Sequence, residues 1–111
     1  MTRGKFAEAV AAYCGLTGGS VTSGGRSQNR NALMAGQAMS GHRFFVGADV
    51  VYDADLTPAE TEQIAAKLGR LVIIPAKPPL AQRLDMAQRL GLLLLAEGDH
   101  DHLQPLDWKA G

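Results

Sequence analysis

The sequence lacks the features that define several large classes of protein. It has one cysteine, Cys14, in 111 residues, so no internal disulfide can form. Eleven basic residues balance eleven acidic ones, and no stripe of Lys and Arg is available to neutralise phosphates, so we expect no nucleic-acid partner. Apolar runs such as Leu92–Ala96 are far too short to cross a membrane, so we expect no membrane insertion.

A secretory signal is also missing from the first residues. Arg3 and Lys5 provide the positive charge that begins such a signal, but Glu8 interrupts the apolar stretch that must follow. We therefore expect the chain to be made in a cytoplasm without a signal peptide, and to reach any target outside it by another route.

What is present suffices for one compact domain spanning residues 1–111. Hydrophobic residues make up 46% of the chain, which can supply a core without disulfides. Cys14 ends an apolar, helix-like run and is predicted to be a small core residue rather than a reactive thiol.

The spacing of apolar residues and turn signals predicts an α+β fold with a short, mainly antiparallel sheet flanked by about three helices. Thr57, Pro58 and Glu60 form a typical helix start, and Gly69 a typical stop. Residues 27–41 are predicted to be an irregular loop with one helical turn, and Asp53 and Asp55 to lie in a solvated loop. The predicted helices span 5–13, 57–68 and 80–91, and the predicted strands 20–23, 44–52, 71–74, 92–96 and 102–106.

Histidines and carboxylates flank these strands. Asp49 follows His42 by seven residues and lies in an apolar run, where it is either buried with a partner or turned outward while Ala48 and Val50 face the core. His100 and His102 alternate, so they share a face if their segment is extended. Two imidazoles and one carboxylate make a zinc site with a fourth position open for water.

The same residues resemble the signature of the D-Ala-D-Ala carboxypeptidase family of zinc peptidases, peptidase M15 type, which includes phage endolysins that cleave L-Ala-D-Glu bonds. One matching motif is an acidic residue, Asp99, three positions before a histidine, His102. This histidine is the second of the His-x-His pair His100 and His102. The first motif is longer and comprises Ser23-Gly24-Gly25-Arg26-Ser27, Asn31, Gly36, Ser40-Gly41-His42 and Ala48-Asp49.

The resemblance implies that zinc binds to His42, Asp49 and His102, on the sheet. It places Asp99 as the general base, with His100 and Arg26 stabilising the transition state. Ser40 would contact the substrate or support the site.

Two features leave the assignment open in detail. Glu97 stands three residues before His100, so the acid and ligand pair could be shifted by two residues. Phe45 occupies a position where the family has glycine, and Gly47 one where it has alanine. We expect Phe45 to affect substrate binding, and the segment Leu71–Leu80 to be an insertion that lines or covers the cleft.

The first hypothesis is thus a zinc-dependent peptidoglycan hydrolase, of D-Ala-D-Ala carboxypeptidase or L-Ala-D-Glu endopeptidase type, acting on the cell wall after release, as a phage-encoded enzyme does. Its only implied partner is the peptidoglycan peptide substrate, and no protein partner is evident. The alternative is a non-catalytic, metal-stabilised structural or virion-associated module of the same fold.

Overall fold

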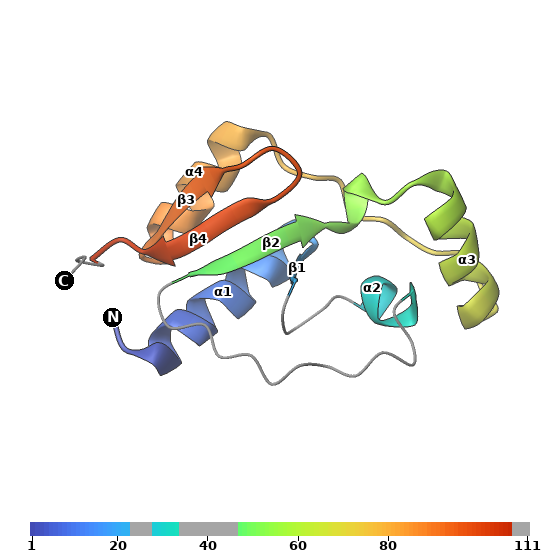
Figure 1. Ribbon diagram of the computed structural model, residues 1–111, viewed down its shortest axis with the longest axis horizontal. Coiled ribbons are helices and arrows are strands. Elements are labelled where there is room, and N and C mark those ends of the chain that lie inside the picture. The colour runs from blue at the N-terminus through green and yellow to red at the C-terminus, as the bar shows by residue number, and fades with distance from the viewer. Residues whose placement is uncertain (23–27, 34–46, 108–111) are drawn as a thin grey trace.

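The computed structural model describes residues 1–22, 28–33 and 47–107, which form a four-stranded antiparallel sheet and helices (Figure 1). The strand order is β1-β2-β4-β3. The α+β class and the antiparallel sheet predicted from the sequence are confirmed. The strands are β1 (Gly19–Val21), β2 (Ala48–Tyr52), β3 (Leu92–Ala96) and β4 (Asp101–Pro105), and the helices are α1 (Arg3–Thr17), α2 (Gln28–Leu33), α3 (Pro58–Leu68) and α4 (Leu80–Arg89), with a 3-10 turn η1 (Asp53–Asp55).

The core lies between one face of the sheet and the helices α1 and α4, which both lie behind the sheet in Figure 1. Strands β2 and β4 each alternate between buried and half-buried residues, so one face of each strand is buried and the other partly exposed. The buried apolar side chains of this core are Phe6, Ala9, Val10 and Tyr13 of α1, Val21, Ala48, Val50 and Tyr52 of β1 and β2, and Ala87, Leu92, Leu94 and Leu103 of α4, β3 and β4.

Helix α3 begins as the sequence predicts. The Thr57 side chain accepts a hydrogen bond from the Glu60 N–H, and the Glu60 carboxylate accepts one from the Thr57 N–H. This capping box satisfies two donors that the first turn of a helix leaves open. Gly69 ends the helix at φ 66°, in the left-handed region that glycine adopts without strain.

Helix α1 is longer than predicted. It spans Arg3–Thr17 instead of 5–13, continues through Gly15, and stops before Gly18, which adopts a left-handed φ of 72°. Either glycine could end a helix, and only the second is followed directly by the chain entering β1.

The predicted buried strand at 71–74 is wrong. This segment is irregular, and Leu71 and Ile73 are 92% and 88% exposed. The Ile73 carbonyl accepts a hydrogen bond from the Asn29 side chain at 3.3 Å rather than from a neighbouring strand. Apolar content alone cannot specify a strand, because a strand also needs a partner for its backbone.

The solvated loop predicted at Asp53 and Asp55 is half right. Asp55 is exposed and pairs with Lys77 at 3.0 Å. Asp53 is only 2% exposed and accepts a hydrogen bond from the Asn29 side chain at 3.2 Å, with the Arg30 guanidinium 3.5 Å away. A buried carboxylate needs such partners, and α2 supplies them.

Cys14 packs against the core, as predicted, and we expect its thiol to react slowly. Burial raises its pKa from 9.0 to about 11, so its thiolate fraction at pH 8 falls by about 100-fold. Alkylation by iodoacetamide should therefore be slow in the folded protein, accelerate up to about pH 11, and reach the rate of a free thiol in denaturant. Rapid alkylation of the folded protein at pH 8 would contradict this assignment.

Within the three described ranges, no helix combines the length and the apolar character that crossing a bilayer requires.

Candidate metal centre

Asp49 and His102 lie opposite each other on neighbouring strands. The register of β2 and β4 pairs them directly, and the Asp49 Oδ1 is 3.0 Å from the His102 Nδ1. Their side chains are 47% and 26% exposed. Two residues that are 53 positions apart in the sequence thus meet on the partly exposed face of the sheet.

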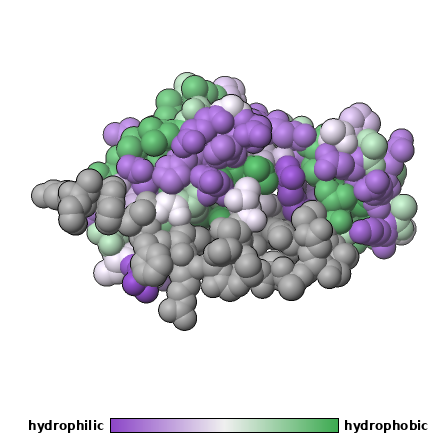
Figure 2. All heavy atoms as spheres, in the orientation of Figure 1, coloured by the Kyte–Doolittle hydropathy of each residue, from purple (hydrophilic) through white to green (hydrophobic). Residues whose placement is uncertain are grey.

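The orientation of Asp49 resolves the alternative that the sequence left open. Ala48 and Val50 are buried at 5% and 0%, so Asp49 faces away from the core. The same alternation on β4 buries Asp101 and Leu103 and turns His102 outward. In Figure 2, hydrophilic residues gather over β4 on the face turned toward the viewer.

Gly47, directly before β2, makes room for the His102 ring. A Cβ atom placed on Gly47 would lie 2.3 Å from the His102 Cε1 and 2.7 Å from Nε2. Such approaches are far inside van der Waals contact, so only glycine fits beside the ring in this position. In the sequence, Gly47 stood out because the resembling family has alanine there. The need for glycine becomes visible only from the position of the His102 side chain, 55 residues away.

His100 lies in the turn between β3 and β4 rather than in the strand, so the condition under which it would share a strand face with His102 is not met. Its Nδ1 is 2.8 Å from the Asp99 Oδ1, and its Nε2 is 3.5 Å from the Glu97 Oε2. The turn is closed by a hydrogen bond from the Glu97 N–H to the His100 carbonyl.

These contacts change the protonation of the turn. The hydrogen bond to Asp99 raises the pKa of His100, with further contributions from the carboxylates of Asp49, Asp99 and Glu97. The same hydrogen bond lowers the pKa of Asp99. The Asp49 carboxylate, which bonds to His102, thus also favours the charged form of His100.

Four of the predicted site residues lie outside the described residues. They are Arg26, Ser40, His42 and Phe45. Within the ranges that the structure describes, no three His, Cys, Asp or Glu side chains are grouped closely enough to hold a metal ion. A three-ligand site at Asp49 and His102 therefore requires a residue such as His42.

The Asp49–His102 geometry suits two ligands of one zinc ion. Bonds of 2.0–2.2 Å to a tetrahedral zinc place two ligand atoms about 3.3 Å apart. The 3.0 Å between the carboxylate oxygen and the imidazole nitrogen is close to this separation.

A cavity of about 630 Å³ lies elsewhere, between α1 and the segment after α3. Leu71, Val72 and Ile73 line it, whereas Asp49 and His102 do not. Among the described residues, the predicted insertion thus lines a cavity in which Asp49 and His102 take no part.

Asp101 has a role that was not predicted, since it lies between the predicted strands 92–96 and 102–106. Asp101 is 3% exposed and bonds to side chains from β2 and α4. Alternation with His102 was the available signal, since one of the two had to face the core.

No family model matches the chain, and the searches of curated proteins and of solved structures returned no significant match.

Proposed function

We propose that the protein is a zinc-dependent peptidase that hydrolyses peptide bonds of peptidoglycan, of the D-Ala-D-Ala carboxypeptidase or L-Ala-D-Glu endopeptidase type. The observation that carries this proposal is the contact between Asp49 and His102 at 3.0 Å. Each belongs to a different one of the two motifs that resemble the zinc peptidases, and their meeting is what a shared metal ion requires.

The contact also favours one of the two open assignments. Asp49 bonds to His102, whereas His100 bonds to Asp99. This supports His102 as the metal ligand and Asp99, three residues before it, as its acidic companion. His42 completes the ligand set in this proposal, and the fourth position is left for water.

Each residue then has one chemical task. Bound zinc would acidify the attacking water and polarise the scissile carbonyl. Asp99 accepts a proton from the water as the water oxygen forms a bond to the carbonyl carbon. The proton passes to the amide nitrogen as the C–N bond breaks, which releases an amine and a carboxylate. Arg26 and His100 donate hydrogen bonds to the oxyanion that develops on the former carbonyl oxygen.

The turn is built for this role in one respect. The hydrogen bond from His100 keeps Asp99 ionised over a wider pH range by lowering its pKa. An ionised carboxylate can receive a proton, and the 94% exposure of its side chain leaves it accessible to water and substrate. The lowered pKa also makes it a weaker base, so desolvation by the bound substrate would be needed to strengthen it.

The proposal is tested by elemental analysis of the purified protein together with mass spectrometry of peptidoglycan fragments after digestion. We expect one zinc per chain, and new fragments that differ by hydrolysis of a single peptide bond. A chelator should abolish the cleavage, and added zinc should restore it.

Two other outcomes are distinct. Zinc at one per chain without any cleavage would support the non-catalytic module of the same fold. Absence of bound metal after incubation with zinc would overturn both versions, because both require Asp49 and His102 to share an ion.

A further inference from the structure

Four buried polar side chains are linked on the opposite side of the sheet from the Asp49–His102 pair. We call them the Asp101 network: Tyr13, Tyr52, Arg83 and Asp101. The Asp101 Oδ2 accepts hydrogen bonds from the Tyr52 hydroxyl at 2.6 Å and from the Arg83 Nε at 2.8 Å. The hydroxyls of Tyr13 and Tyr52 are 2.5 Å apart. None of the four residues is more than 8% exposed.

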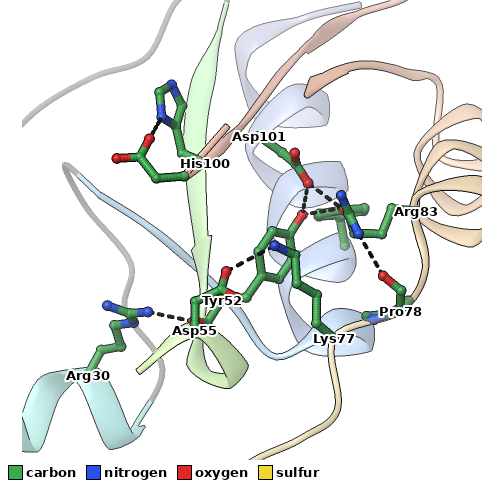
Figure 3. Close-up of polar contacts among 10 residues, drawn as sticks. Arg30, Tyr52, Asp55, Lys77, Pro78, Arg83, His100 and Asp101 are labelled. Atoms are coloured by element: carbon green, nitrogen blue, oxygen red, sulfur yellow. Dashed lines mark hydrogen bonds and ion pairs between the residues drawn. The ribbon is translucent and has the colours of Figure 1, made fainter. Parts of the chain in front are cut away.

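Figure 3 shows Tyr52, Arg83 and Asp101 pointing toward one another, whereas His100 points away from them. The Arg83 Nη1 also donates to the Pro78 carbonyl at 2.7 Å, and its guanidinium carbon is 5.5 Å from the centre of the Tyr52 ring. The network therefore joins α1, β2, β4, α4 and the chain before α4 at one point.

The position of the network relative to the candidate metal centre is fixed by the strand register. Val50 pairs with Asp101, and Asp49 pairs with His102. The bond between Tyr52 and Asp101 thus ties β2 to β4 from the other face, and it joins a residue three positions after Asp49 to the residue directly before His102.

This link opposes the movement that would most damage the metal centre. A slip of β4 by one residue would turn His102 into the core and Asp101 out of it. Such a slip would break both bonds to Asp101 and leave the Arg83 guanidinium buried without a carboxylate, which is costly in a low-dielectric interior.

We propose that the two bonds of the network that reach Asp101, from Tyr52 and from Arg83, position His102 against Asp49, so that Tyr52, Arg83 and Asp101 are positioning residues of the metal centre and Tyr13 is not. The expected effect on zinc affinity rests on the proposed function. The geometric part concerns the imidazole of His102 and can be measured without any metal.

The chain offers a matched pair of variants. Tyr52→Phe removes the hydroxyl that bonds to Asp101 and keeps the ring beside Arg83. Tyr13→Phe removes the other hydroxyl, which bonds to the Tyr52 hydroxyl, and leaves the link between β2 and β4. Each variant deletes one buried hydroxyl, so general destabilisation affects both.

Two measurements separate positioning from stability. One is the zinc affinity by competition with a chelator, and the other is the ¹⁵N chemical shifts of the His102 ring in zinc-free protein. We expect Tyr52→Phe to weaken zinc binding by about tenfold, at the low end of what loss of an outer partner costs, and to shift the His102 signals. For Tyr13→Phe, the zinc affinity should stay within twofold of that of the unchanged protein, and the His102 chemical shifts should equal those of the unchanged protein.

The inference is overturned if His102 signals in zinc-free Tyr52→Phe match those of the unchanged protein. If the unchanged protein binds no zinc, the proposed function fails, but the zinc-free signals still decide the positioning in either direction. Should Tyr52→Phe not fold, Arg83→Lys serves instead, since a lysine ammonium cannot reproduce the two directed bonds to Asp101 and Pro78. Its expected result is the same.

Discussion

Replacement of Asp99 by alanine is expected to lower the rate of peptidoglycan cleavage by about 10²- to 10⁴-fold, the usual range for loss of a general base. Zinc content should stay at one per chain, because Asp99 is not among the proposed ligands. The fold should also persist, since the Asp99 side chain is 94% exposed and its side-chain contact is with His100 in the same turn. The measurements are initial cleavage rates, metal content and urea denaturation of the purified variant.

The matched control for this variant is Asp85→Ala. Asp85 is an exposed carboxylate on α4 that pairs with Arg89 at 2.8 Å, so its removal also deletes one surface contact. We expect its cleavage rate to equal that of the unchanged protein. A similar loss in both variants would show that Asp99 has no special role.

Glu97→Ala decides between the two acid and histidine pairs. If Asp99 is the base, this variant should retain most of its activity, because the Glu97 carboxylate is 3.5 Å from His100 and has no described contact with Asp49 or His102. Full activity in Asp99→Ala together with a large loss in Glu97→Ala would move the base to Glu97 and the ligand to His100.

Replacement of Gly47 by alanine is expected to displace the His102 ring from Asp49 in zinc-free protein. If the ring keeps its described position when it holds zinc, the zinc affinity should fall by about 10- to 100-fold, even though the resembling family has alanine at this position. The added Cβ would lie 2.3 Å from the His102 Cε1, so the ring must rotate away from Asp49. Gly47 has no positive φ, so the effect comes from lost space and not from backbone strain. The checks are chelator competition and the His102 ring signals.

Gly15→Ala is the control for that substitution. Gly15 lies within α1, and a Cβ there meets nothing within 4 Å. Alanine in a helix is favoured over glycine by roughly 1 kcal/mol, so this variant should be slightly more stable and bind zinc unchanged. Unaltered zinc binding in Gly47→Ala would mean that His102 does not occupy the described position when it holds the ion.

The sequence predicted best where one short segment contains all the interacting groups. The capping box of α3 needs only Thr57 and Glu60, which are three residues apart, and it is confirmed. The β3–β4 hairpin likewise joins the predicted strands 92–96 and 102–106, with shifts of at most one residue, through a short polar turn. The prediction of a strand at 71–74 was wrong because a strand requires a hydrogen-bonded partner strand, and a local sequence pattern does not show whether a partner strand is present.

The candidate site shows the same division. Its residue types and motif order are visible in the chain, including Asp49, Asp99 and His102. The sequence did not reveal that Gly47 makes room for the His102 ring, or that Asp101 turns inward to meet Tyr52 and Arg83. Each of these depends on atoms brought together from segments that are far apart.

The sequence by itself determined the α+β class, the caps of helix α3 and the presence of imidazole and carboxylate groups that could bind a metal. Local backbone geometry and side-chain chemistry are written into neighbouring residues, so they can be read without coordinates. Only the tertiary structure decided that Asp49 faces outward and that it meets His102 at 3.0 Å. The reason is that strand register and facing are set by the packing of the whole sheet against α1 and α4, where a shift of one residue exchanges the core and the surface.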